Sequence, residues 1–315
     1  VLLAALLMIG TQAGFTFSGL KDFMASGREL AHAELIGALL IAGFGTLISL
    51  FPFHSWAAPA YASAPAPVAM MHAGVLKKFG LYGLFMFQPL METGFLPWTN
   101  ILLVLLVCNV IWVGYVTVNQ KRLDLLLGNS SVMHMGYIFL AFAALVVSGS
   151  AEANPWALKG AALLMLAHGL TIALLFLLCG QIEKQTGTLE INSLGGLSTR
   201  LPRMAFVFGL AGMASIGLPG LANFPGEFMV FFSGFAGFSN GFGPVQIATI
   251  LCLWGLVIGA VYMLRAYRNI FQGDLSKASA YATGLQPSER AANCFLVIAL
   301  AVFGFFPTLV LQFFS

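Results

Sequence analysis

Long apolar runs, each about as long as a bilayer is thick, are the feature that most constrains this sequence. A helix needs about 20 mostly apolar residues to cross the hydrocarbon core. The run from Thr99 to Val118, TNILLVLLVCNVIWVGYVTV, contains no charged residue. By this criterion we expect nine spans, near residues 1–16, 34–52, 66–88, 99–118, 128–148, 157–180, 204–236, 246–267 and 291–313.

The shortage of charged residues leads to the same fold class. Only 8% of the 315 residues are charged, against about 25% in soluble domains, so most of the outer surface must face lipid. The sequence therefore predicts an all-α polytopic membrane protein embedded in a lipid bilayer. Its net charge of +3 is small and its basic residues do not cluster, so no nucleic-acid partner is expected.

Two of the runs contain residues that prevent a regular helix. Prolines interrupt the stretch FPFHSWAAPAYASAPAP, residues 51–67, and the segment GLPG, residues 217–220, divides the seventh run. Irregular backbone is tolerated at membrane depth only where protein or a water-filled cavity satisfies its polar groups. We therefore expect broken helices near 51–60 and 217–222, one in each of two related structural units, each break holding an ion or substrate site.

Basic residues favour one orientation of the expected spans. One side receives Lys121, Arg122, Lys184, Arg200, Arg203, Arg265, Arg268, Lys277 and Arg290, whereas the other receives Lys21, Arg28 and Lys159. Loops rich in lysine and arginine stay in the cytoplasm. The sequence thus predicts cytoplasmic basic loops and an external C-terminus, with the bacterial plasma membrane as the expected location.

Few ionisable side chains are expected within the membrane. They are His54, His72, Lys77, Lys78, His134, His168 and Glu227. Burial of such groups costs several kcal/mol, so each is a functional candidate by default. Connected by water, a series of them can pass protons, which is the chemistry that this set fits best.

Each candidate also has a purely structural interpretation. A lysine can extend its ammonium group to the membrane surface, but Lys78 lies about twelve residues into its span, too deep to do so easily. Adjacent helical residues point about 100° apart, so only one of Lys77 and Lys78 should face the interior. The histidines could be neutral rings that hydrogen-bond neighbouring helices or freed carbonyl groups, and Glu227 could cap free amides.

Signatures of cofactor binding do not occur in the sequence. It has no Walker motif, no GxGxxG fingerprint, no HExxH and no cysteine run, and its four cysteines stand singly in apolar segments. This chain is therefore expected to bind no nucleotide, flavin, haem, iron–sulfur cluster or metal. Any redox chemistry must belong to a partner.

Several stretches resemble the antiporter-like membrane subunits of respiratory complex I, a family that includes the large subunits of Mrp-type sodium/proton antiporters. They are FPFHSWAAPAYASAPAPVAMMHAGVLKKFGLYGL, NSSVMHMGY, LAHGLTIALLFLLCGQ, GGL and GLPGLANFPGEFMVFF. The resemblance, from about residue 35 to the end, implies about fourteen helices in two inverted repeats with one broken helix each. The nine spans would be the sixth to fourteenth helices, with an earlier part preceding Val1.

The resemblance also implies a proton path. Its connecting lysine matches Lys78 in LKKFGLYGL, its histidines match His134 in NSSVMHMGY and His168 in AHGL, and its terminal acid matches Glu227 in NFPGEF. The glutamate of the first half-site would precede Val1. Neighbouring antiporter-like subunits of a membrane arm are the expected partners, and NADH, flavin, iron–sulfur clusters and quinone are expected in other subunits.

The first half-site departs from the family pattern. The family lysine seven residues before the histidine of the first broken helix is replaced by Leu47. The family's aspartate and histidine just after that motif fall on Pro59 and Tyr61, and Asp124 stands where a lysine is expected. The sequence therefore predicts an altered or lost first half-site beside an intact second one.

Three regions and three functions follow from this comparison. Residues 1–118 would be the remainder of the first antiporter-like half, residues 119–267 the second half, and residues 268–315 a loop and a C-terminal helix. The preferred function is a proton-translocating subunit of an NADH–quinone oxidoreductase of the complex I type. Two alternatives stay open: an Mrp-type cation/proton antiporter subunit, and a structural membrane-arm subunit whose first half-channel is degenerate.

Overall fold

A computed structural model gives the fold and describes residues 1–90, 92–236 and 241–314. Within these residues the chain is helical, with no strand and one isolated bridge between Arg122 and Glu190. The α-helices are α1 (Leu2–Ala13), α2 (Phe17–Ala25), α3 (Ala33–Ile48), α4 (Ala57–Ser63), α5 (Ala66–Met71), α6 (Lys77–Phe87), α7 (Glu92–Phe95), α8 (Thr99–Val118), α9 (Leu123–Ser148), α10 (Pro155–Thr186), α11 (Pro202–Ser215), α12 (Asn223–Ser233), α13 (Pro244–Phe271), α14 (Pro287–Phe305) and α15 (Thr308–Leu311). A π-helical turn, η1 (His72–Leu76), joins α5 to α6. The prediction of an all-α protein is confirmed.

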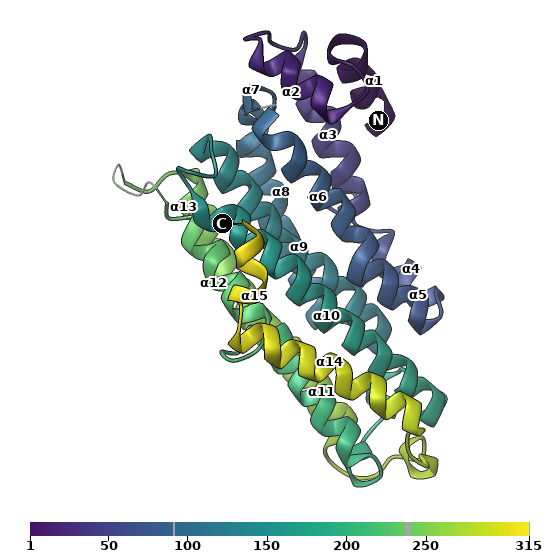
Figure 1. Ribbon diagram of the computed structural model, residues 1–315. Helices are drawn as coiled ribbons and strands as arrows, with labels where there is room; N and C mark the ends of the chain where they lie inside the picture. Colours follow the sequence, from purple (N-terminus) through teal and green to yellow (C-terminus); the bar gives the residue numbers. More distant parts are fainter. Residues whose placement is uncertain (91, 237–240, 315) are drawn as a thin grey trace.

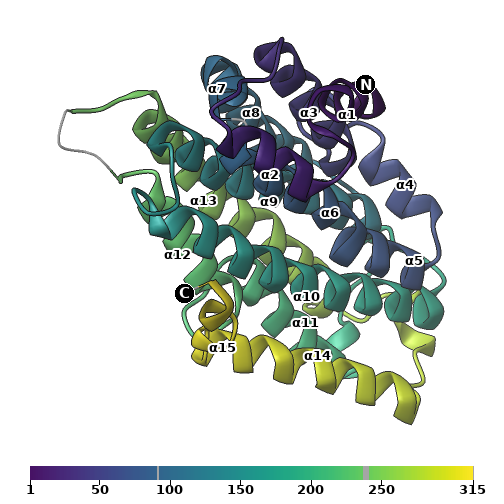
Figure 2. The same ribbon diagram turned by 45° about the horizontal axis from the view of Figure 1, so that its top comes forward.

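Helix α9 runs through the middle of the bundle, where it contacts α4, α8, α10, α12 and α13 (Figure 1). Almost every residue of α9 is buried, as expected for a helix that is apolar on all sides. Small residues let its neighbours come close: a Cβ on Gly136 would lie 3.0 Å from the Leu106 carbonyl oxygen of α8. Helices α1, α2, α3 and α6 lie on one side of this core, and α11 and α14 lie on the other (Figures 1 and 2).

Fewer helices are long and apolar enough to cross a membrane than the nine that we expected. Among the described residues five qualify, Thr93–Val118, α9, α10, α13 and α14, and α1 with α2 makes a sixth if the 55° bend between them is part of one span. Helix α3 has only 16 residues, the expected span 204–236 is two shorter helices, and the segment 66–87 carries two lysines and a histidine. The count of nine was wrong because a run of apolar residues does not show where a helix bends or ends.

Both expected breaks are present. Helix α11 ends at Ser215 and α12 begins at Asn223, so the segment between them lies outside regular helix. At the first break residues 51–56 form turns and α4 begins at Ala57. The predicted range 51–60 was therefore too long, because Pro59 lies in the first turn of α4, where the N–H that it lacks would have no helical partner.

The side chain of Asn109 on α8 satisfies backbone groups at the first break. Its Oδ1 accepts a hydrogen bond from the Phe51 N–H at 2.5 Å, and its Nδ2 donates to the Ser49 carbonyl at 3.1 Å. Asn109 is completely buried. One amide side chain thus supplies partners that irregular backbone in an apolar environment requires.

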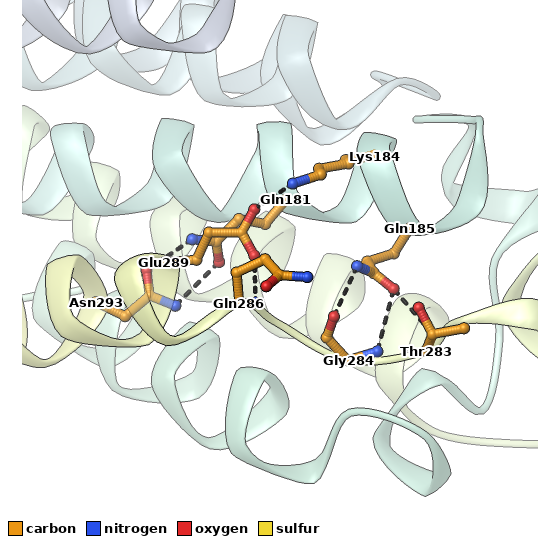
Figure 3. Close-up of polar contacts among 8 residues, drawn as sticks. All are labelled: Gln181, Lys184, Gln185, Thr283, Gly284, Gln286, Glu289 and Asn293. Atoms are coloured by element: carbon orange, nitrogen blue, oxygen red, sulfur yellow. Dashed lines mark hydrogen bonds and ion pairs between the residues drawn. The ribbon is translucent and has the colours of Figure 1, made fainter.

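Polar contacts hold the C-terminal helix α14 against the end of α10 (Figure 3). Gln181 and Asn293 exchange hydrogen bonds of 3.1 and 2.9 Å, and Lys184 Nζ lies 2.7 Å from Glu289 Oε1. Gln185 hydrogen-bonds the loop that precedes α14. We name these five residues the α10–α14 polar cluster. Only 11% of the most apolar part of α14 is buried, so the cluster supplies much of what fixes the position of this helix.

Candidate proton-transfer site

His134 on α9 and His168 on α10 form a stacked pair inside the bundle. Their ring centroids are 5.1 Å apart and their planes are inclined by 18°. Both side chains are buried, and the Ser131 hydroxyl lies 3.3 Å from His168 Nε2. The structure therefore brings together two candidates from different helices, with a hydroxyl group beside them.

Both ring nitrogens of His134 face carbonyl oxygens. Nδ1 lies 2.8 Å from the carbonyl oxygen of Ser130, and Nε2 lies 2.9 Å from that of Ser215. A carbonyl oxygen only accepts and a neutral imidazole has one N–H, so both contacts are hydrogen bonds only when His134 is an imidazolium. The Ser215 carbonyl is free because α11 ends there, and the C-terminal end of a helix favours a nearby cation. The second break thus offers a place for a proton on His134.

Lys78 approaches the histidine pair from the start of α6. The π turn before it packs against α10, where a Cβ on Gly169 would lie 2.7 Å from the Gly74 carbonyl oxygen. Because His168 precedes Gly169, this close contact brings the π turn, and Lys78 just after it, near the histidine pair. The Lys78 ammonium group donates to a carbonyl of the π turn.

Lys77 is buried as well, although only one of the two lysines was expected to face the interior. The exposed fraction is 0% for Lys77 and 9% for Lys78. Lys77 Nζ lies 5.5 Å from the centroid of the Tyr61 ring and has no hydrogen-bond partner among the described residues. The expectation was wrong because Tyr61 of α4 covers Lys77 and α6 also packs against α3 and α9.

Glu227 lies in the second turn of α12, with its carboxylate facing the second break. The side chain is 3% exposed. Oε2 lies against Gly217, whose φ of +77° is left-handed, and a Cβ at this glycine would overlap the oxygen. Oε1 has no hydrogen-bond partner among the described residues, although capping free amides would require one. A buried carboxyl group without fixed partners is suited to gain and lose a proton.

Two buried tyrosines lie beside the histidine-bearing part of α9. The Tyr137 ring lies 5.6 Å from the His134 ring, and the Tyr262 hydroxyl lies 2.7 Å from Ser130 Oγ. Both tyrosines are within electrostatic reach of Glu227. Reasoning from the sequence missed them because tyrosine is common in apolar runs. The only signal for Tyr137 was its position three residues after His134, on the same helix face.

At the first break, His72 lies beside Tyr61 and His54 lies in the turns before α4. His72 Nδ1 lies 3.3 Å from the Tyr61 hydroxyl, and the His72 ring meets the Trp56 ring edge-on at 5.5 Å. His54 stacks on Phe51 with 5.3 Å between ring centroids. Both histidines are half-buried. They form a separate group, which we name the first-break cluster: His54, Tyr61 and His72.

The positions that depart from the family pattern differ in their surroundings. Leu47 is 36% exposed near the end of α3, and Pro59 is exposed. Asp124 is buried in the first turn of α9 and lies 2.6 Å from Arg122, and its hydrogen bond raises the pKa of the Arg122 guanidinium. A carboxylate in the first turn of a helix also interacts favourably with the helix dipole. Asp124 therefore has a structural role at the start of α9.

The described residues offer little to hold a metal or a cofactor. Among them, no three His, Cys, Asp or Glu side chains are grouped as metal ligands would be. The four cysteines are unpaired thiols. The arrangement of ionisable side chains along α6, α9, α10 and α12 is suited to proton exchange.

Comparison with known sequences places these features in a family. Residues 1–252 match the sequence profile of the family described as "NADH:quinone oxidoreductase/Mrp antiporter, TM". NAD(P)H-quinone oxidoreductase chain 4 1 of Synechococcus elongatus is 35% identical over 321 residues, which cover 99% of this chain and 57% of that protein. The protein of the same name from Synechococcus sp. (strain JA-2-3B'a(2-13)) is 31% identical over 318 residues, which cover 99% of this chain and 58% of that protein. The chain thus spans a little over half the length of these curated relatives.

Solved structures share the fold. A chain of respiratory complex I from Thermus thermophilus superposes with a TM-score of 0.86 at 26% identity, covering 99% of this chain and 63% of that one. A chain of the Mrp complex from Dietzia sp. DQ12-45-1b superposes with a TM-score of 0.81 at 19% identity, and the match covers 99% of this chain and 64% of that one. The second match supports the fold alone. The apolar helices and the matched transmembrane profile together show an integral membrane protein.

Proposed function

Because the chain belongs to the NADH:quinone oxidoreductase/Mrp antiporter family of transmembrane proteins, we propose that it moves protons in the membrane arm of a complex I-type NAD(P)H–quinone oxidoreductase. The observation that carries this proposal is the buried His134–His168 pair at the second break, with Lys78 and Glu227 buried nearby. This chain supplies no redox chemistry. NADH, flavin, iron–sulfur clusters and quinone belong to other subunits, and neighbouring membrane-arm subunits are its partners.

The proposed path runs from Lys78 through the histidine pair to Glu227. Lys78 exchanges protons with His168, which passes them to His134, and water with the hydroxyls of Tyr137 and Tyr262 completes the route to Glu227. When His134 loses its proton, one ring nitrogen faces a carbonyl oxygen without a hydrogen, and such an unsatisfied contact is unfavourable. The protonation of His134 is therefore coupled to the geometry of the second break.

The wider architecture of the proposal follows the family. The proposed subunit is an inverted repeat in which residues 1–118 belong to the first half, residues 119–267 form the second half, and residues 268–315 form a loop and a C-terminal helix. The membrane is the bacterial plasma membrane, and the basic loops face the cytoplasm. Protons therefore leave the cytoplasm when the complex pumps.

Two other functions have specific support. The description of the matched family includes Mrp antiporters, which supports an antiporter subunit, and the exposed Leu47 at the family's lysine position supports a structural subunit with a degenerate first half. Purification of the native complex through a tag on this chain distinguishes an Mrp-type antiporter subunit from the subunit that we propose. Copurifying flavin and iron–sulfur subunits would support a complex I-type enzyme, whereas copurifying antiporter subunits alone would support the Mrp type.

The variant Glu227→Gln tests the proton path directly. Glutamine keeps the size and hydrogen-bonding capacity of the side chain but cannot take up a proton. We expect the complex to assemble and to pump fewer protons per electron, with Glu227→Asp retaining part of the activity. Glu152→Gln, a change at an exposed residue, is the control. Pumping is measured in inverted membrane vesicles, and normal pumping by an assembled Glu227→Gln complex would refute the role.

A further inference from the structure

Lys77 and Lys78 are adjacent in sequence, but their ammonium groups have different contacts. The Lys78 ammonium group bonds the Ala73 carbonyl and lies within electrostatic reach of the His134–His168 pair. Lys77 Nζ lies over the Tyr61 ring, within electrostatic reach of His54 and His72 in the first-break cluster. Lys77 also interacts electrostatically with His168, and this interaction is weaker than that between Lys78 and His168. Lys78 acts on His72 as well, but less strongly than Lys77, whose Nζ lies over the ring of Tyr61, the residue beside His72.

Structural roles do not account for a lysine at this position. Its Nζ is buried, so the side chain does not extend to a polar surface, and it has neither a hydrogen-bond partner nor a counterion among the described residues. The Tyr61 ring gives a cation–π contact but accepts no full hydrogen bond. A methionine would fill the same space without burying an amine, which makes the ability to hold and release a proton the distinguishing property of Lys77.

We infer that Lys77 is a proton carrier that links the first-break cluster to the Lys78–His168–His134 series. This inference rests on the proposed proton translocation. In each transfer the Lys77 ammonium group loses one proton and becomes a neutral amine, while the His72 imidazole or the Lys78 amine gains that proton and becomes a cation. Lys77 and Lys78 are adjacent in the chain, so a proton on one ammonium group disfavours a proton on the other by like-charge repulsion.

Substitutions that separate charge from proton exchange test this role in the full complex. Lys77→Met removes both properties, Lys77→Arg keeps a cation that does not release its proton, and Lys77→His keeps a titratable group. Protons pumped per electron are measured in inverted membrane vesicles with NADH or NADPH as the donor. We expect Met and Arg to remove the share of the ratio that this chain contributes, and His to retain part of it. Lys121→Met, at an exposed lysine, is the matched control.

The outcomes distinguish this inference from the proposed function. A normal ratio in Lys77→Met, with low ratios in Lys78→Met and Glu227→Gln, would overturn the role of Lys77 and leave the wider path standing. Normal ratios in all three variants would remove the proposed path itself. Normal pumping by Lys77→Arg would show that a fixed charge is sufficient, and failure of Lys77→Met to assemble would assign the lysine to packing. Either result counts against the inference.

Discussion

Gly217 allows a direct test of whether the second break positions Glu227. Its backbone is left-handed, with a φ of +77°, and a Cβ would overlap Glu227 Oε2. The variant Gly217→Ala therefore strains the backbone and displaces the carboxylate. These two effects can be separated, because another glycine shares the backbone conformation without the contact.

Gly187, which follows the end of α10, is that matched position. Its φ is +72°, and no atom lies within 4 Å of a Cβ placed on it. A left-handed conformation costs an alanine about 1–2 kcal/mol, and this penalty applies to both variants. The carboxylate is the mobile end of a side chain, so its displacement to another rotamer adds only about 0.5–1.5 kcal/mol at Gly217. We therefore expect Gly217→Ala to lose more stability than Gly187→Ala, but by no more than about 1.5 kcal/mol.

Proton pumping should differ much more than stability. Thermal unfolding of the purified complexes measures stability, and the initial rate of proton pumping in inverted vesicles measures activity. We expect Gly217→Ala to reduce pumping about tenfold relative to Gly187→Ala, which corresponds to about 1.4 kcal/mol in the barrier. If the two variants pump equally well, the break does not position Glu227 and the reasoning fails.

The remaining predictions concern the first half-site and the α10–α14 polar cluster. Leu47→Lys places an unpaired ammonium group on an apolar surface at a cost of up to about 3 kcal/mol, so assembly should fall without a gain in pumping. A well-assembled variant with a higher proton-to-electron ratio would contradict the degenerate half-site. Gln181→Leu leaves the buried Asn293 amide unpaired and should cost about 1–3 kcal/mol in thermal unfolding. Adding Asn293→Leu should recover much of this stability, and equal stabilities of the single and double variants would show that the pair contributes little.

The sequence by itself determined the fold class, the two breaks and the burial of most candidate residues. The apolar runs predicted helices in a membrane, and Gly217 to Gly220 predicted the interruption that separates α11 from α12. Glu227 stands alone within a long apolar segment, so its burial also followed from its neighbours. These properties are local: the free energy of transfer into an apolar environment is a sum over nearby residues, and glycine and proline act on their own backbone.

The tertiary structure alone decided which groups meet. It placed the Ser215 carbonyl against His134 Nε2, buried Lys77 beneath Tyr61, and brought Tyr262 to Ser130. It also ended α3 after 16 residues, which the apolar run did not indicate. Such contacts depend on the rotation, register and spacing of whole helices, which the close packing of many side chains determines together. For that reason a single apolar segment can show that its polar residue is buried, whereas only the assembled bundle specifies the partner with which that residue exchanges a proton.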